Sequence, residues 1–214
     1  MWLAASCTAR NAMSRTARPG LSEAAFVADF AALAASVAES GADIVEADLS
    51  CPNVARREGE VYLDVKLSTE IARATKAVAG GRPVLLKIGD IPDRAKMAAF
   101  LDSVAGAADG IVMINAPSRR IVDGAGAPAF GTGRERAGVT GGAIRDIALR
   151  AVHDAASHIL RRGLPLKVIG VGGITSAPDA RAFLEAGAYA VQSATAATWN
   201  PRLALEIKSA APEI

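Results

Sequence analysis

Residues 166–176 read Leu-Lys-Val-Ile-Gly-Val-Gly-Gly-Ile-Thr-Ser, a pattern typical of a buried strand that ends in paired glycines and leads into a helix. The β-branched residues favour the strand. Gly172 and Gly173 have no Cβ, so their backbone N–H groups can approach a ligand closely. A hydroxyl residue after the glycines can cap the helix together with Asp179, and such a helix end attracts anions. The stretch therefore predicts a strand–turn–helix unit that binds an anion at its turn.

A second unit of the same kind follows directly. Residues 189–195 read Tyr-Ala-Val-Gln-Ser-Ala-Thr, which predicts a strand that ends in small residues. Two neighbouring strands with small ends, each followed by a helix, form the usual phosphate site in the last two units of a (β/α) barrel. A plain tight turn would explain one glycine pair alone. The repetition in the next unit favours phosphate binding.

The rest of the chain repeats the alternation of strand and helix. Further strands are expected at residues 2–6, 43–49, 83–88 and 110–114, with helices at 22–40, 69–79, 93–105 and 142–162, and long loops at 50–66 and 115–140. The strands are mostly continuous apolar runs, which are typical of a parallel sheet covered by helices. The predicted fold class is α/β, a parallel (β/α)8 TIM barrel.

The strands and helices expected from the sequence make up only about six C-terminal units of this barrel, whereas a full barrel has eight. The phosphate signature belongs to the last two units, so the missing pair is the first two. Residues 1–214 are therefore expected to form one incomplete barrel domain. Its completion would need further sequence, a second copy of the chain in a homodimer, or another chain that supplies the missing units.

Composition limits the classes of partner. The chain has 214 residues, of which 51% are hydrophobic, enough for one sizeable core. A net charge of +2 gives no indication of a nucleic-acid partner. No apolar run reaches the length of a membrane span. The two cysteines, Cys7 and Cys51, indicate no disulfide framework and fit the reducing cytoplasm. No His, Cys or carboxylate positions have metal-ligand spacing, so no metal is expected.

Cys51 is the first candidate for chemistry. It lies in the run Leu-Ser-Cys-Pro-Asn, residues 49–53, just after an expected strand, where barrel active sites are built. A cysteine there could act as a nucleophile or as a proton-transfer base, and Asn53 offers an amide to a polar ligand. The alternative is a buried structural thiol.

Lys87 and Asn115 are the next candidates. Lys87 interrupts the apolar run of residues 84–88, so its charge needs a partner or the barrel mouth. It could stabilise an anion such as a reduced flavin ring, or form a Schiff base, unless its head simply reaches water. Asn115 ends a strand and offers a donor and an acceptor, although asparagine also favours turns. Gly141, in a glycine-rich run at residues 138–142, could wrap a ligand or form a hinge.

These motifs, taken in order along the chain, resemble the dihydroorotate dehydrogenase family of FMN-dependent barrels, which includes the catalytic domains of dihydropyrimidine dehydrogenases. The resemblance rests on residues 49–53, Lys87, Asn115, 138–142, 172–173 and 192–195. It implies an oxidoreductase with FMN as its cofactor and a pyrimidine-like substrate. The Leu-Ser-Cys-Pro-Asn run is its most specific part.

The resemblance also implies roles for individual residues. Cys51 matches the base that takes a proton from C5 of the dihydropyrimidine while a hydride passes to flavin N5, which indicates the soluble cysteine-base class. Lys87 matches the lysine beside flavin N1, and Asn53 and Asn115 match substrate-holding amides. The positions around the ribityl phosphate match Gly141, Gly172, Gly173, Ala194 and Thr195.

One departure from the family pattern concerns the substrate. Asp48 stands where the family usually has asparagine, directly before the Leu-Ser-Cys-Pro-Asn run. An amide both donates and accepts, whereas an ionised carboxylate only accepts. Asp48 is therefore expected at the substrate site, where it would repel the carboxylate of orotate.

Three functions stay open at this point. An FMN-dependent oxidoreductase acting on the CH–CH bond of a dihydropyrimidine-like substrate accounts for the ordered motifs. An inactive or incomplete homologue that binds a phosphate ligand or a partner chain accounts for the missing units. A Schiff-base aldolase using Lys87 agrees with the phosphate site but explains neither residues 49–53 nor Asn115.

Overall fold

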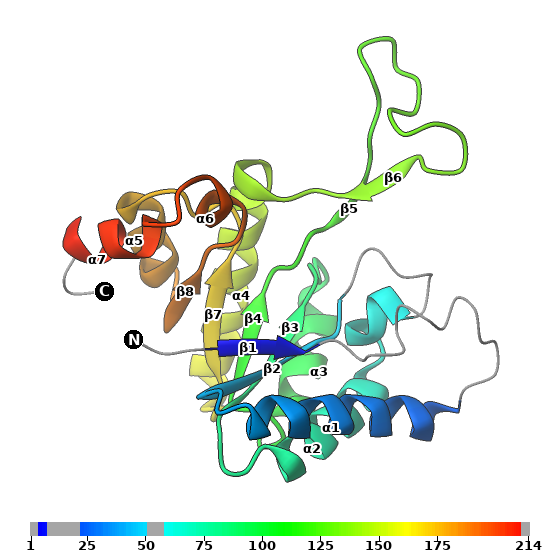
Figure 1. Ribbon diagram of the computed structural model, residues 1–214, viewed down its shortest axis with the longest axis vertical. Helices are drawn as coiled ribbons and strands as arrows, with labels where there is room; N and C mark the ends of the chain where they lie inside the picture. Colours follow the sequence, from blue (N-terminus) through cyan, green and yellow to red (C-terminus); the bar gives the residue numbers. More distant parts are fainter. Residues whose placement is uncertain (1–3, 8–21, 51–57, 211–214) are drawn as a thin grey trace.

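The structure of the protein, a computed structural model, describes residues 4–7, 22–50 and 58–210. Its main element is a six-stranded parallel sheet with the strand order β1-β2-β3-β4-β7-β8 (Figure 1). The strands are β1 (Ala4–Cys7), β2 (Ile44–Asp48), β3 (Val84–Ile88), β4 (Gly110–Met113), β7 (Lys167–Val171) and β8 (Ala190–Gln192). This is the parallel α/β arrangement that the sequence predicts.

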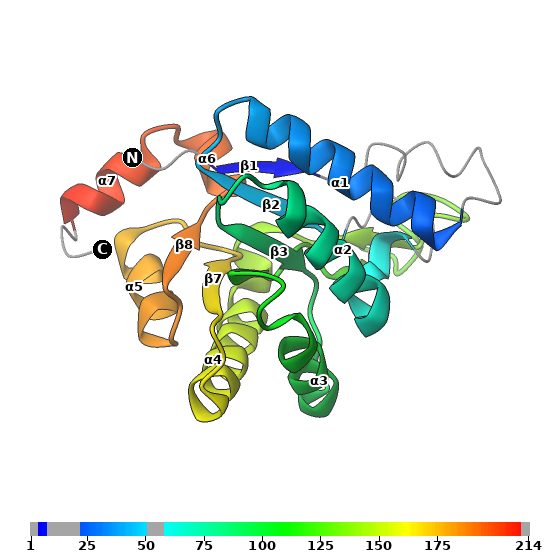
Figure 2. The ribbon, with the colours of Figure 1, turned by 90° about the horizontal axis from the view of Figure 1, so that it is seen from below.

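Helices connect the successive strands of the sheet, and two more follow β8. They are α1 (Glu23–Glu39), α2 (Val65–Val78), α3 (Arg94–Val104), α4 (Arg145–Arg162), α5 (Ala177–Glu185), α6 (Thr195–Trp199) and α7 (Leu203–Ala210), with short 3-10 helices η2 (Glu58–Leu63) and η3 (Gly141–Ile144). Figure 2 shows the sheet curving, with α2, α3, α4 and α5 arranged around its outer side. The described part of the chain thus forms an open, curved section of a barrel wall.

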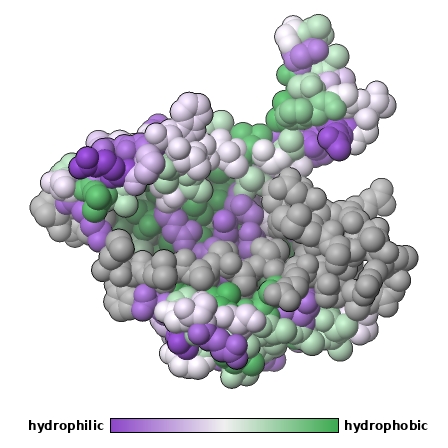
Figure 3. Space-filling model, in the orientation of Figure 1, coloured by the Kyte–Doolittle hydropathy of each residue, from purple (hydrophilic) through white to green (hydrophobic). Residues whose placement is uncertain are grey.

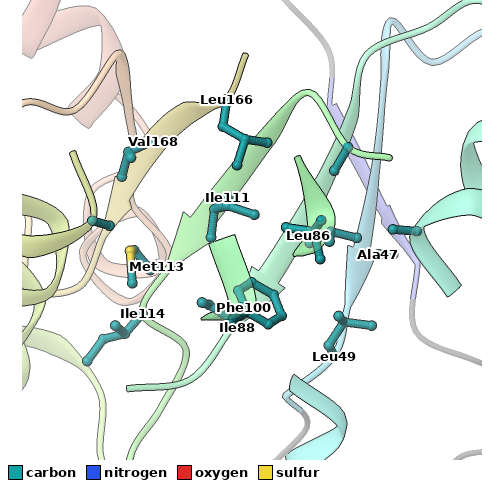
Figure 4. Packing of buried hydrophobic residues seen from close by; sticks show 14 of the residues in the cluster. Ala47, Leu49, Leu86, Ile88, Phe100, Ile111, Met113, Ile114, Leu166 and Val168 are labelled. Atoms are coloured by element: carbon teal, nitrogen blue, oxygen red, sulfur yellow. The ribbon is translucent and has the colours of Figure 1, made fainter. Parts of the chain in front are cut away.

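The two faces of the sheet have different neighbours. Outward-facing strand residues such as Ala47, Leu86, Ile111 and Met113 pack with helix residues such as Phe100 in one large core (Figure 4). The alternate positions face the concave side, where a small cluster forms from Leu85, Val112, Ile169 and Val171. Because both faces bury apolar residues, the strands read as continuous apolar runs.

Local capping sets where the helices begin. The Ser22 hydroxyl accepts from the N–H of Ala25 at 3.2 Å and begins α1, as its sequence predicts. The helix expected at residues 69–79 in fact begins at Val65, because the Asp64 carboxylate accepts from the N–H of Leu67 at 3.0 Å. The loop expected at residues 50–66 also contains η2. Side-chain caps thus moved a boundary that hydrophobic periodicity alone had set.

The segment expected as a long loop, residues 115–140, contains an antiparallel hairpin. Its strands are β5 (Ser118–Arg120) and β6 (Arg136–Gly138), joined by backbone pairing and by the Arg136 guanidinium, which donates to the Ser118 carbonyl at 2.7 Å. This hairpin, here called the arm, projects from the sheet and carries both hydrophilic and hydrophobic surface (Figures 1 and 3). Phe130, in the segment between its two strands, is 58% exposed. The sequence did not predict β5 and β6, because their short polar strands show no alternation of apolar residues.

The described residues contain neither a membrane-spanning helix nor a cluster of metal ligands. None of the helices they form is long and apolar enough to cross a membrane. No group of three or more His, Cys, Asp or Glu residues within the described ranges could hold a metal ion.

Candidate functional site

A pocket of about 230 Å³ lies at the carboxyl ends of β3, β4, β7 and β8. In parallel α/β folds this edge of the sheet is where ligands bind. The pocket brings together seven residues expected at the site, from five separate parts of the chain: Lys87, Asn115, Gly141, Gly172, Gly173, Ala194 and Thr195. These seven residues therefore lie together at one edge of the sheet, and their roles in binding stay predictions.

The glycine pair after β7 forms a turn that no other residue fits without distortion. Gly173 has φ +75°, and a Cβ there would lie 2.8 Å from the Arg145 Cβ and 3.0 Å from the Gly141 carbonyl oxygen. Gly172 has φ +131°, and its Cβ would lie 2.9 Å from the Ala148 Cβ. The turn thus packs directly against the start of α4, and its backbone lines the pocket.

Three residues that line this pocket have backbone N–H groups without a partner among the described residues. Among the backbone hydrogen bonds of the described residues, none is donated by the N–H groups of Gly173, Ala194 or Thr195. All three residues line the pocket. Free N–H groups at the ends of neighbouring parallel strands are suited to the oxygens of a phosphate. The donor set therefore fits a phosphate-bearing ligand.

The amino end of α5, in contrast, is already occupied by its own carboxylate. Asp179 accepts from the Thr175 N–H at 3.0 Å, the Thr175 hydroxyl at 2.7 Å, the Ser176 hydroxyl at 2.9 Å and the Arg145 guanidinium at 2.8 Å. Burial by itself raises the pKa of Asp179, but these hydrogen bonds outweigh it and lower that pKa to about 2. The Ser176 hydroxyl in turn accepts from the Asp179 N–H at 3.4 Å, so this pair caps α5 as expected. The pocket-lining N–H groups without a partner among the described residues are instead those of Gly173 and of the loop after β8.

Lys87 reaches the pocket from β3. It is half-buried, and no hydrogen bond or ion pair within the described ranges involves its ammonium group. Its strand neighbour in the register is Asp48, yet the two side chains form no ion pair. A cation placed in this way is available to a ligand, since a half-buried charge without a partner is costly.

Asn115 and Asp48 contact each other beside the pocket. The Asn115 Nδ2 donates to the Ser50 carbonyl and lies 3.4 Å from Asp48 Oδ2. Asp48 Oδ1 also accepts from the Ser50 N–H at 2.9 Å and from the Ser50 hydroxyl at 3.0 Å. Asp48 therefore orders the chain just before Cys51.

Two of the predicted site residues, Cys51 and Asn53, lie outside the described residues. Leu49 and Ser50, which precede them, are buried at the carboxyl end of β2, the same edge of the sheet as the pocket. The roles of Cys51 and Asn53 stay predictions.

One polar pair inside the curved sheet escaped the sequence reasoning. Glu46 is only 3% exposed, and its Oε2 accepts from the Gln192 Nε2 at 2.7 Å. Glu46 interrupts the apolar residues of β2 just as Lys87 interrupts β3. The charged residue within an apolar strand was therefore the sequence feature that could have identified Glu46, as it identified Lys87.

Comparison with known proteins agrees with this geometry. The family model for dihydroorotate dehydrogenase matches residues 11–213. A dihydroorotate dehydrogenase of Dictyostelium discoideum is 33% identical over 186 residues, which cover 85% of this chain and 50% of that protein.

Two bacterial relatives have the name dihydroorotate dehydrogenase B (NAD(+)), catalytic subunit. That of Alkaliphilus oremlandii is 32% identical, covering 85% of this chain and 57% of the relative. That of Maridesulfovibrio salexigens is 34% identical, covering 87% and 59%. The chain thus spans between half and three fifths of these curated relatives. Because the family model spans nearly all of the sequence, the chain belongs to the dihydroorotate dehydrogenase family.

Proposed function

We propose that this chain binds FMN and takes part in the oxidation of a dihydropyrimidine-like CH–CH bond, or in the reverse reduction. The observation that carries the proposal is the pocket at the strand ends. It combines an amide with a cation and backbone N–H groups that have no partner within the described part of the chain. The family names of the relatives support the same reaction type.

The residues present fit the parts of FMN. Its phosphate suits the backbone donors of Gly173, Ala194 and Thr195, where the absence of side chains at the glycine turn allows close approach. Lys87 supplies a positive charge at the same pocket, which suits the negative charge of a reduced flavin ring. When bound, FMN supplies the hydride acceptor, at its N5 atom.

The chain's own residues would supply the rest of the chemistry. The Cys51 thiolate would take a proton from C5 of the substrate, so that this proton and the hydride leave adjacent carbons and a C=C bond forms. Asn53 and Asn115 would hold the ring by hydrogen bonds. Lys87 would balance the charge that develops during the transfer.

Titration of the purified protein with FMN, followed by flavin fluorescence, tests the cofactor. Replacement of Cys51 by alanine is then expected to slow substrate-driven bleaching of the flavin absorbance by about 10²–10⁴-fold, with unchanged FMN affinity, because a positioned base contributes that much. Cys7→Ala, which removes the other cysteine, is the matched control. Failure to take up FMN would overturn the cofactor, and equal rates in Cys51→Ala would overturn the base.

A further inference from the structure

We propose that Asp48 is a specificity-determining positioning residue, which holds the Asn115 amide with its carbonyl oxygen toward the pocket. The site would then accept an uncharged ring that donates an N–H, and it would reject a ring that bears a carboxylate. This inference rests on the proposed function and names its substrate class.

The orientation of the Asn115 amide follows from what surrounds it. The backbone N–H of Asn115, which follows β4, donates to the Ile88 carbonyl at 2.8 Å and so holds the residue beside the end of β3. On one side its side chain meets two acceptors, the Ser50 carbonyl and the Asp48 carboxylate. Only the NH₂ end of the amide can satisfy both, because a carbonyl oxygen facing them would be repelled.

The other end of the amide is therefore the one left for a ligand. Asn115 lines the pocket, and no hydrogen bond within the described ranges is accepted by its Oδ1. The site consequently presents an acceptor here. A ring N–H is the complementary group on a pyrimidine-like ligand.

The charge of Asp48 acts in the same direction. Its carboxylate oxygen Oδ2 lies 3.4 Å from the Asn115 Nδ2, and no ion pair within the described ranges neutralises it. Ser50 supplies neutral donors only. A ligand carboxylate brought to this wall would meet both an acceptor and a like charge, each unfavourable at short range.

Asparagine at position 48 would change this arrangement without removing the loop contacts. Its side-chain oxygen could still accept from the Ser50 N–H and hydroxyl, while its NH₂ would add a donor and the charge would be lost. Asp48→Asn is therefore a nearly isosteric test of specificity.

Uracil and orotate are the matched probes, since they differ by one carboxylate. Calorimetric titration of the FMN-loaded chain is expected to show tighter binding of uracil. In Asp48→Asn the preference should shift toward orotate by about tenfold. Asp123→Asn is the control, because the Asp123 carboxylate likewise accepts hydrogen bonds from nearby loop residues, here two backbone N–H groups, but lies in the exposed arm. A preference that is unchanged in Asp48→Asn would overturn the inference.

A second measurement is independent of the flavin. The chain has four asparagines, so few side-chain amide signals are expected in the ¹⁵N spectrum, and Asn115→Asp identifies the one from Asn115. Its protons should exchange with water several-fold faster in Asp48→Ala than in the unmodified chain. Equal exchange rates would overturn the contact itself. If FMN fails to bind while exchange is slow, the proposed function is wrong and the Asp48–Asn115 contact stands.

Discussion

Asp179 is the residue that most firmly joins the glycine turn to its surroundings. It accepts four hydrogen bonds, from Thr175, Ser176 and Arg145, and its side chain is only 10% exposed. Thr175 and Ser176 follow the turn after β7, and Arg145 begins α4. The carboxylate therefore holds the turn after β7 against the start of α4, and it does not bind the N–H groups that line the pocket.

The lowered pKa of Asp179 makes the stability that these hydrogen bonds contribute dependent on pH. A folded-state pKa of about 2, against an ordinary value of 3.8, means that ionised Asp179 stabilises the fold above about pH 4. That contribution, about 2 kcal/mol, is lost as the pH falls toward 2. Asp179→Asn should therefore lower the free energy of unfolding by about 2 kcal/mol at pH 7, with a gap that narrows below pH 4.

Urea unfolding at a series of pH values measures this gap. Asp146→Asn is the control, because the Asp146 side chain is 93% exposed and its contact with Arg145 is long, at 3.7 Å. It should change the free energy of unfolding by less than about 0.5 kcal/mol at any pH. A gap for Asp179→Asn that stays constant down to pH 2 would contradict the assigned role.

At the level of single residues, the sequence predicted the contents of the pocket better than its supports. Lys87, Asn115 and the glycines were recognisable because each breaks a local pattern of its strand or turn. The contact of Asp179 with Arg145 was not, because the two residues are 34 positions apart and neither breaks a pattern. Such supports depend on the tertiary packing of α4 against the turn.

At the level of elements, every predicted strand and helix exists, and the errors lie at boundaries and in the two long loops. Continuous apolar runs identified the parallel strands because both faces of the sheet are buried. The arm was missed because its strands of three residues are polar and mostly exposed. Short exposed hairpins are stabilised by backbone pairing, which leaves little trace in hydrophobic periodicity.

The turn between β7 and α5 gives a prediction at this scale. Gly173→Ala forces a Cβ into a positive φ and against α4, so we expect the free energy of unfolding to fall by about 2 kcal/mol or more. FMN affinity should fall as well, because the turn must shift. Chemical denaturation and FMN titration measure the two effects.

Gly126→Ala separates strain from crowding. Gly126 has a similar φ of +82°, but a Cβ there would meet nothing within 4 Å. Its cost should be that of backbone strain alone, about 1 kcal/mol, with FMN affinity unchanged. Equal costs at the two glycines would show that packing of the turn against α4 contributes nothing.

At the scale of the whole molecule, one side-chain contact reports the curvature of the sheet. Glu46 on β2 and Gln192 on β8 are separated in the sheet by β3, β4 and β7, yet their side chains form a hydrogen bond of 2.7 Å. Strands so far apart in a flat sheet could not meet. The pair therefore spans the concave side and links two distant strands of the wall.

Removal of both partners should cost less stability than the sum of the two single removals. Gln192→Ala leaves the buried Glu46 carboxylate without its amide partner, so the free energy of unfolding should fall by about 1–3 kcal/mol. Glu46→Leu alone leaves the Gln192 amide without its carboxylate partner. In the double variant Glu46→Leu/Gln192→Leu neither polar group remains, so its cost should be smaller than the sum of the single costs. A double-mutant cycle by urea unfolding measures the coupling, and strict additivity would mean that this contact does not hold the sheet in its curve.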